Sequence, residues 1–139
     1  MVDALRRAHR MLKPDGCVVD LHPSAARALV EAGGQLTGYV DAGDAPLRHA
    51  AAGVAPATAI QERLLVVDRE VVFDFYTYGG SIEELRDYVV ENWREGHIDD
   101  ETVERTRQLV RDAPPGTRPR LRERVHLTTL RPHRDPADS

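Results

Sequence analysis

Asp20 and His22 are the pair of side chains in this sequence most suited to chemistry. They lie two residues apart in the apolar segment Cys17–Leu21, and on a strand that spacing sends both side chains to the same face. A carboxylate beside an imidazole supports acid–base chemistry near neutral pH. If the final strand pairs beside this one, Glu123 or His126 comes close. Asp20, His22 and His126 are therefore the candidate catalytic residues, or ligands of a divalent metal.

A structural interpretation of the same residues stands beside the chemical one. Asp20 can orient the following loop, and His22 can lie half exposed before Pro23. Two residues do not make a metal site, so the sequence predicts neither metal ligands nor cofactor-binding residues.

Other residues that could do chemistry have simpler roles. Trp93 and His97 could line a pocket, but a Trp on the apolar stripe of a helix is usually part of the core. Cys17 is expected to be a small buried hydrophobic residue. The sequence contains no Gly-x-Ser-x-Gly, His-Glu-x-x-His, Cys-x-x-Cys or phosphate-binding glycine loop.

Composition narrows the classes of protein. The chain has 139 residues and a formal charge of −4, which argues against non-specific nucleic-acid binding. No apolar run is long enough to cross a bilayer. The single cysteine excludes an intramolecular disulfide and favours a cytoplasmic location. We expect one domain over residues 1–131 and a disordered tail over residues 132–139.

The periodicity of apolar residues predicts an α/β domain, or α+β by stricter sorting, with a small mixed sheet of four to five strands and flanking helices. Residues 25–40 are ambiguous: a hairpin around Gly33-Gly34 is the preferred prediction, and a helix over Ala25–Ala32 followed by a strand is the alternative. The other predicted elements are helices over Val2–Leu12, Ala45–Leu64 (broken near Gly53 and Pro56), from the Ser81-x-x-Glu84 capping box onward, and from Asp99 or Asp100 to before Pro114, with strands over Cys17–Leu21, Leu65–Tyr78 and Leu121–Leu130.

One stretch resembles a known family. The turn Leu12-Lys13-Pro14-Asp15-Gly16 before the strand Cys17–Leu21 is similar to a segment of class I S-adenosylmethionine-dependent methyltransferases, in which a helix ends in Leu-Lys/Arg-Pro-Gly-Gly before the fifth sheet strand. Asp15 stands where the family usually has glycine. The downstream order of helical insert, aromatic-rich strand, Ser-x-x-Glu helix and alternating strand is also similar. The resemblance covers nearly the whole chain but only the carboxyl-terminal half of that Rossmann-like fold, and it implies that the last two strands form an antiparallel pair.

The cofactor-binding half of the family's fold is missing. Only twelve residues precede the Lys-Pro turn, and no strand, glycine-rich turn or acidic strand end fits there. The segment Gly38–Gly43 is a poor substitute because Pro46 and a broken helix follow it. We therefore expect no cofactor for the chain alone, with S-adenosylmethionine bound only if a partner supplies the missing half. The chain is not expected to be a self-sufficient methyltransferase.

The resemblance also implies that the strand Cys17–Leu21 lacks a parallel neighbour, which leaves an unpaired sheet edge. The hairpin over residues 28–40, a second copy of the chain or a different protein could cover it. The expected function is that of a non-catalytic, methyltransferase-related domain acting through protein association, most simply as a homodimer. The alternatives are a methyltransferase subunit or fragment completed by a partner chain, or an unrelated small-ligand-binding or metal-dependent α+β protein that uses Asp20, His22 and His126.

Overall fold

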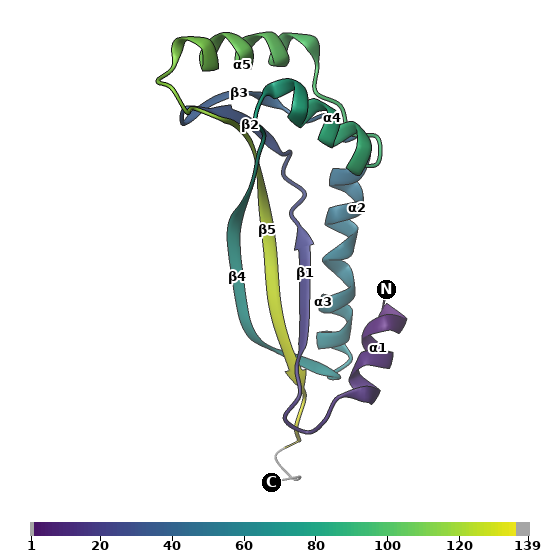
Figure 1. Cartoon of the computed structure of the whole chain (residues 1–139). Coiled ribbons are helices and arrows are strands. Elements are labelled where there is room, and N and C mark those ends of the chain that lie inside the picture. The colour runs from purple at the N-terminus through teal and green to yellow at the C-terminus, as the bar shows by residue number, and fades with distance from the viewer. Residues whose placement is uncertain (1, 136–139) are drawn as a thin grey trace.

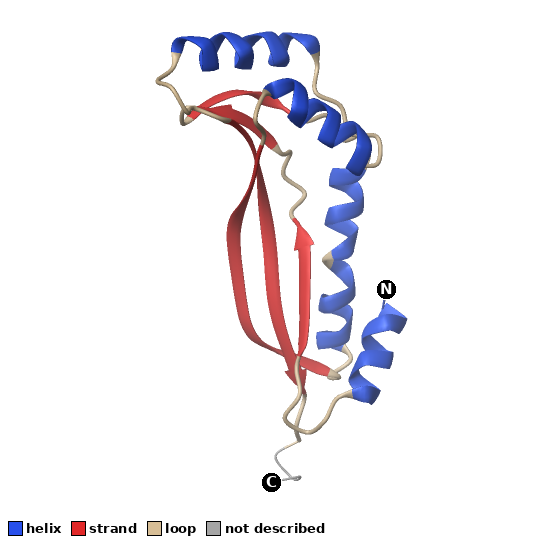
Figure 2. Cartoon of the chain, viewed as in Figure 1, coloured by secondary structure: helices blue, strands red, loops and turns tan. Residues whose placement is uncertain are grey.

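The computed structural model describes residues 2–135 and has an α+β fold, in which helices pack against a five-stranded sheet (Figures 1 and 2). In chain order, the elements are α1 (Val2–Met11), β1 (Val18–Pro23), β2 (Leu29–Ala32), β3 (Gln35–Tyr39), α2 (Ala45–Ala52), α3 (Val54–Gln61), β4 (Leu65–Tyr78), α4 (Ile82–Asn92), α5 (Asp100–Asp112) and β5 (Pro119–Pro132). Helices α4 and α5 lie at one end of the long β4–β5 pair, and helix α1 lies near the other (Figure 1).

The sheet is organised around β5. Strand β4 pairs with β5 along almost its whole length, while β1 and β2 share the opposite edge of β5. The lower half of β5 (residues 125–130) pairs with β1, and its upper half (residues 119–122) pairs with β2. Each of these pairings, and that of β2 with β3, is antiparallel. The number of strands agrees with the sequence prediction. The prediction of a mixed sheet was wrong, because β1 has no parallel neighbour among the described residues.

Local sequence signals explain several boundaries. The hairpin prediction for residues 28–40 is confirmed, with Gly33 and Gly34 at φ values of 57° and 76°, a region that glycine enters without strain. Ser81 caps α4, and its Oγ accepts a hydrogen bond from the Glu84 amide at 3.1 Å. Asp99 caps α5 in the same way, at 2.6 Å from the Thr102 amide.

The buried residues form two separate cores. The upper core lies between α4, α5 and the β2–β5 part of the sheet, and includes Leu85, Val89 and Leu121. The lower core is smaller: Ala59, Leu65 and Leu130 are fully buried where α1 and α3 meet the β1–β5–β4 part of the sheet.

The two cores lie on opposite faces of the sheet. Side chains alternate along a strand, so odd and even residues of β5 face opposite ways. In the upper half the odd residue Leu121 is buried, and in the lower half the even residue Leu130 is buried. Each half of the sheet therefore has one face covered by helices of this chain and one face left open.

The ends of the described chain are defined by contacts. Strand β5 extends through Pro132, and the His133 amide donates a hydrogen bond to the Leu64 carbonyl at 3.0 Å. Strand β5 therefore ends one residue beyond the predicted domain boundary at residue 131, and residues 136–139 of the predicted tail lie outside the described residues. Within residues 2–135, none of the helices has the length and apolarity needed to cross a membrane.

Candidate functional site

Asp20, His22 and His126 lie together on the helix-covered face of the lower sheet. His22 and His126 are paired in register, and their rings stack with centroids 5.5 Å apart and planes 5° apart. His22 Nδ1 is 2.9 Å from Asp20 Oδ2, and both side chains are about four-fifths buried. The hydrogen bond to Asp20 places a proton on Nδ1 and leaves Nε2 as the nitrogen able to accept a proton. The catalytic role of the three residues stays a prediction.

A cavity of about 320 Å³ separates this cluster from the helices. Its sheet side is polar and its helix side is small and apolar. The lining residues are Asp20, His22, Gly53, Pro56, Ala57, Ile60, Val67, Glu70, His126 and Thr128. Among residues 2–135, no three His, Cys, Asp or Glu side chains are grouped so that they could hold a metal ion. The arrangement is suited to proton transfer and hydrogen bonding.

The opposite face of the lower sheet is apolar and open. Val19 and Leu21 of β1 are each 58% exposed, and Phe75 of β4 is 51% exposed. In the register, Leu21 lies beside Leu127 of β5, which in turn pairs with Val71 of β4, and this forms a continuous apolar row. We call this surface the open apolar face; its members are Val19, Leu21, Val71, Phe73, Phe75, Val125 and Leu127.

Around the cavity beside Asp20 and His22, the polarity of the lower sheet is the reverse of the usual pattern. A sheet with one face against helices normally turns apolar residues toward them and polar residues toward water. Here the covered face carries Asp20, His22 and His126, whereas the exposed face carries Val19 and Leu21. The open apolar face therefore has the composition of a buried surface without a cover from the described residues.

Strand β1 also has an unpaired edge. Among residues 2–135 it pairs only with β5, and the β2–β3 hairpin joins β5 beyond the end of β1. The hairpin therefore does not cover the edge of β1, which rules out one of the three arrangements expected from the sequence. The backbone groups on that edge remain available to another strand.

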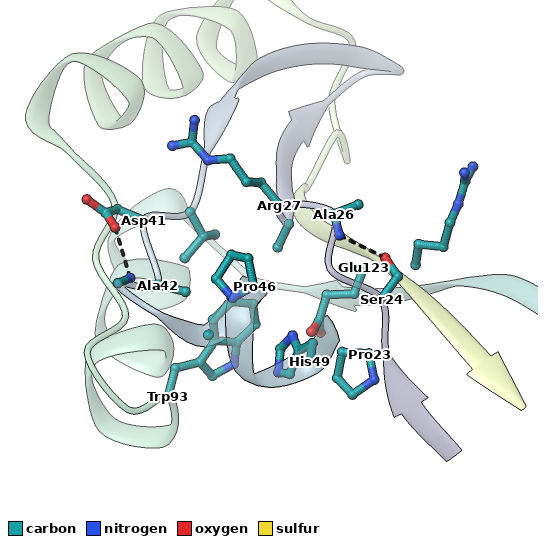
Figure 3. Close-up of a pocket in the computed structure, with 15 residues that line it drawn as sticks. Pro23, Ser24, Ala26, Arg27, Asp41, Ala42, Pro46, His49, Trp93 and Glu123 are labelled. Atoms are coloured by element: carbon teal, nitrogen blue, oxygen red, sulfur yellow. Dashed lines mark hydrogen bonds between the residues drawn. The ribbon is translucent and has the colours of Figure 1, made fainter. Parts of the chain in front are cut away.

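A second cavity, of about 280 Å³, opens where β1 ends (Figure 3). It is bounded by the end of β1, the loop after β3, the first turns of α2 and the end of α4. Trp93, the only tryptophan, lines it, together with Pro46, His49 and Glu123. An adjoining cavity of about 230 Å³ shares Trp93, His49 and Glu123. Trp93 also packs against the upper core, so it is both a core residue and a cavity residue.

Glu123 is the unusual group of this second cavity. Its carboxylate points toward the imidazole of His49 in Figure 3. Burial raises the pKa of Glu123 above its ordinary value, and no hydrogen bond or ion pair with another described residue counteracts this. The sequence suggested that Glu123 might join Asp20 and His22. The structure places it on the other face of β5, because 123 and 126 have opposite parity.

Two further sequence predictions need correction. Cys17 is exposed rather than buried, because β1 begins at Val18 and Cys17 still belongs to the connecting loop. His97 is exposed and does not line a cavity with Trp93; its backbone instead exchanges two hydrogen bonds with Asp41, at 2.7 and 2.8 Å. The sequence analysis missed His49 and Pro46, which lie in an alanine-rich helix whose pattern gives no sign of a cavity.

Within residues 2–135, the fold and the sites define an α+β domain with an open apolar sheet face, unpaired strand edges that include that of β1, and lined cavities beside β1 and at its carboxyl end. Comparison with known proteins adds no family to this description: no protein-family model matches the chain, and no match was found among curated proteins or solved structures.

Proposed function

We propose that this chain is a methyltransferase-related domain that does not methylate on its own and acts by associating with another protein chain, in the first instance a second copy of itself. The observation that carries the proposal is the open apolar face. Seven apolar side chains on three adjacent strands lie on the side away from the helices of the lower core. A contiguous apolar surface of this kind marks a protein interface.

The exposed area of the chain supports the same conclusion. The chain exposes 8959 Å², whereas a compact protein of 15.5 kDa exposes roughly 7,200 Å². The excess of roughly 1,700 Å² falls in the range that each partner buries in an obligate homodimer. A two-fold axis would place two open apolar faces against each other, like the two sheets of a sandwich.

The relation to methyltransferases is supported by the order of the elements. A helix, the Lys13-Pro14 turn and an apolar strand follow one another, and the last two strands, β4 and β5, form an antiparallel pair. These are the features that the resemblance implies for the second half of that fold. The resemblance also places a parallel strand on the edge of β1 that has no partner here.

Light scattering on the purified chain at micromolar concentration tests the association. We expect a dimer that Phe75→Glu converts to a monomer, because the new charge would be buried in the interface. Val72→Glu is the matched control: it lies on the same strand with 48% exposure, against 51% for Phe75, but on the opposite face. A strictly monomeric wild type, or dissociation by both variants alike, would contradict the proposal.

The unpaired edge of β1 favours a second candidate, a methyltransferase completed by a partner chain that supplies the cofactor-binding half. Calorimetric titration distinguishes the two. Neither candidate allows S-adenosylmethionine to bind the chain alone, because no glycine-rich turn is present to cradle it. The second candidate is supported if S-adenosylmethionine releases heat of binding only after a partner carrying such a turn is added. It is rejected if the chain and that partner together show no heat of binding. Tight binding by the chain alone would overturn both.

A further inference from the structure

The cavity around Trp93 and Glu123 has the features of a binding site for a small molecule. It is concave and mostly apolar, and it contains a few convergent polar groups, one of which has a perturbed pKa. Its walls come from segments far apart in the sequence, including β5, which supplies Glu123, so the cavity is a product of the fold rather than of one loop. It lies at the carboxyl end of β1 and borders the open apolar face, because Glu123 pairs in register with Phe75.

Glu123 sets the charge that a ligand must carry. A half-buried carboxylate without a donor is a site where a hydrogen-bond donor or positive charge gains free energy on binding. The other charged or titratable groups around it are Arg27, Arg124, Asp41 and His49 in the same cavity and Arg48 and Arg94 in the adjoining one.

Four of these six neighbours already have partners of their own, among them Arg124, whose Nε lies 3.8 Å from Asp74 Oδ1. Arg27 lies over the ring of Tyr39 at 4.9 Å, and Arg48 is paired with Asp44. Asp41 Oδ1 accepts a hydrogen bond from the Gly43 amide at 3.0 Å. None of the arginines lowers the pKa of Glu123, for which burial is the sole cause of the shift. Glu123 is therefore not neutralised from within the chain.

Trp93 and Pro46 set the shape of the ligand. The indole and the proline ring provide flat apolar walls beside the carboxylate. An aromatic face also attracts a nearby cation. A cavity of about 280 Å³ is at the small end of ligand sites, so it admits one ring with a short side chain.

We propose that this cavity binds a small organic cation, a primary ammonium group carried on an aromatic ring, with Glu123 pairing the ammonium and Trp93 contacting the ring. The seven apolar side chains of the open apolar face do not line the cavity, although Glu123 pairs in register with Phe75 at its border, so this proposal is separate from the proposed association.

Three probes of equal size and different charge test the proposal: 2-phenylethylamine, 2-phenylethanol and phenylacetate. Trp93 is the only tryptophan, so its fluorescence reports binding directly, and calorimetry provides an independent measurement. We expect the amine to bind about tenfold or more tightly than the alcohol, and the anion to bind most weakly.

Variants complete the experiment. Glu123→Gln is expected to reduce the preference for the amine to about twofold or less while leaving the affinity for the alcohol unchanged. Glu91→Gln is the matched control, because it removes an exposed carboxylate of α4 outside the cavity, and it should preserve the preference. Thermal melting of each variant confirms that it is folded. Equal binding of the three probes, preference for the anion, no binding, or a preference that survives Glu123→Gln would each overturn the proposal.

Discussion

Leu21 allows the proposed association to be tested quantitatively. Leu21 is 58% exposed on the open apolar face, where it lies beside Leu127 of the central strand β5. Full burial of a leucine contributes about 1.5–3 kcal/mol, so covering the exposed part contributes roughly 0.9–1.7 kcal/mol in each copy. A symmetric dimer contains the contact twice, which gives roughly 1.7–3.5 kcal/mol.

Leu21→Thr removes most of that contribution while keeping a residue that suits a strand. We therefore expect the dissociation constant of the dimer to rise roughly 20- to 300-fold. Sedimentation equilibrium over a range of concentrations measures it. Val72→Thr is the control on the opposite face, where 48% of the side chain is exposed, and it should change the constant by about twofold at most.

Leu21→Thr should weaken the dimer without destabilising the isolated subunit. Leu21 contacts water rather than the lower core, so Leu21→Thr should alter the free energy of unfolding of the monomer by no more than about 0.5 kcal/mol. A dimer as tight as the wild type in Leu21→Thr, or equal weakening by both threonine variants, would refute the assignment of the interface to this face.

Three other substitutions test the described contacts. Glu123→Gln should stabilise the fold at neutral pH, because a carboxyl whose pKa is raised in the folded state lowers stability once it ionises. The gain in stability should vanish below the ordinary pKa of glutamate. Urea unfolding at pH 7 and pH 4 tests this, and an equal gain at both pH values would contradict it. Thr106→Val should cost about 1–2 kcal/mol in urea unfolding, since the buried hydroxyl lies 2.7 Å from each of two oxygens, and unchanged stability would show that these bonds contribute nothing. Gly38→Ala should cost about 1–3 kcal/mol, because a Cβ there would collide with Thr102, whereas Gly53→Ala has room and should be neutral or stabilising; equal melting temperatures for the two would contradict this.

Local signals were sufficient to predict most elements. The aromatic-rich run Leu65–Tyr78 became β4 with the same bounds, because its β-branched and aromatic residues favour a strand over any alternative. The Gly33-Gly34 pair correctly indicated the hairpin, since both residues adopt positive φ. Such features depend on a few neighbouring residues, and the sequence contains all of them.

The relations between elements could not be predicted in the same way. Alternation along β5 puts Leu121, Val125 and Leu127 on one face, but it does not tell which part of that face receives a helix. The helices cover Leu121 and leave the lower part open, a result of the three-dimensional path of the chain. For the same reason, the cavity lined by Trp93 and Glu123 could not be predicted from the sequence, because its residues come from segments that only the folded chain brings together.

The division of β5 between two cores has a consequence for the dynamics of the chain. The upper core buries nine clustered residues and the lower core three, so the two halves of one strand are held with different strength. Regions with few buried apolar contacts open locally at lower free energy than the rest of a protein. We expect the backbone amides of β1 to exchange with deuterium faster than those of β2, and to slow as protein concentration rises. The lower half of the sheet would then gain its rigidity from the partner chain, and association itself would complete the folding of this end of the molecule.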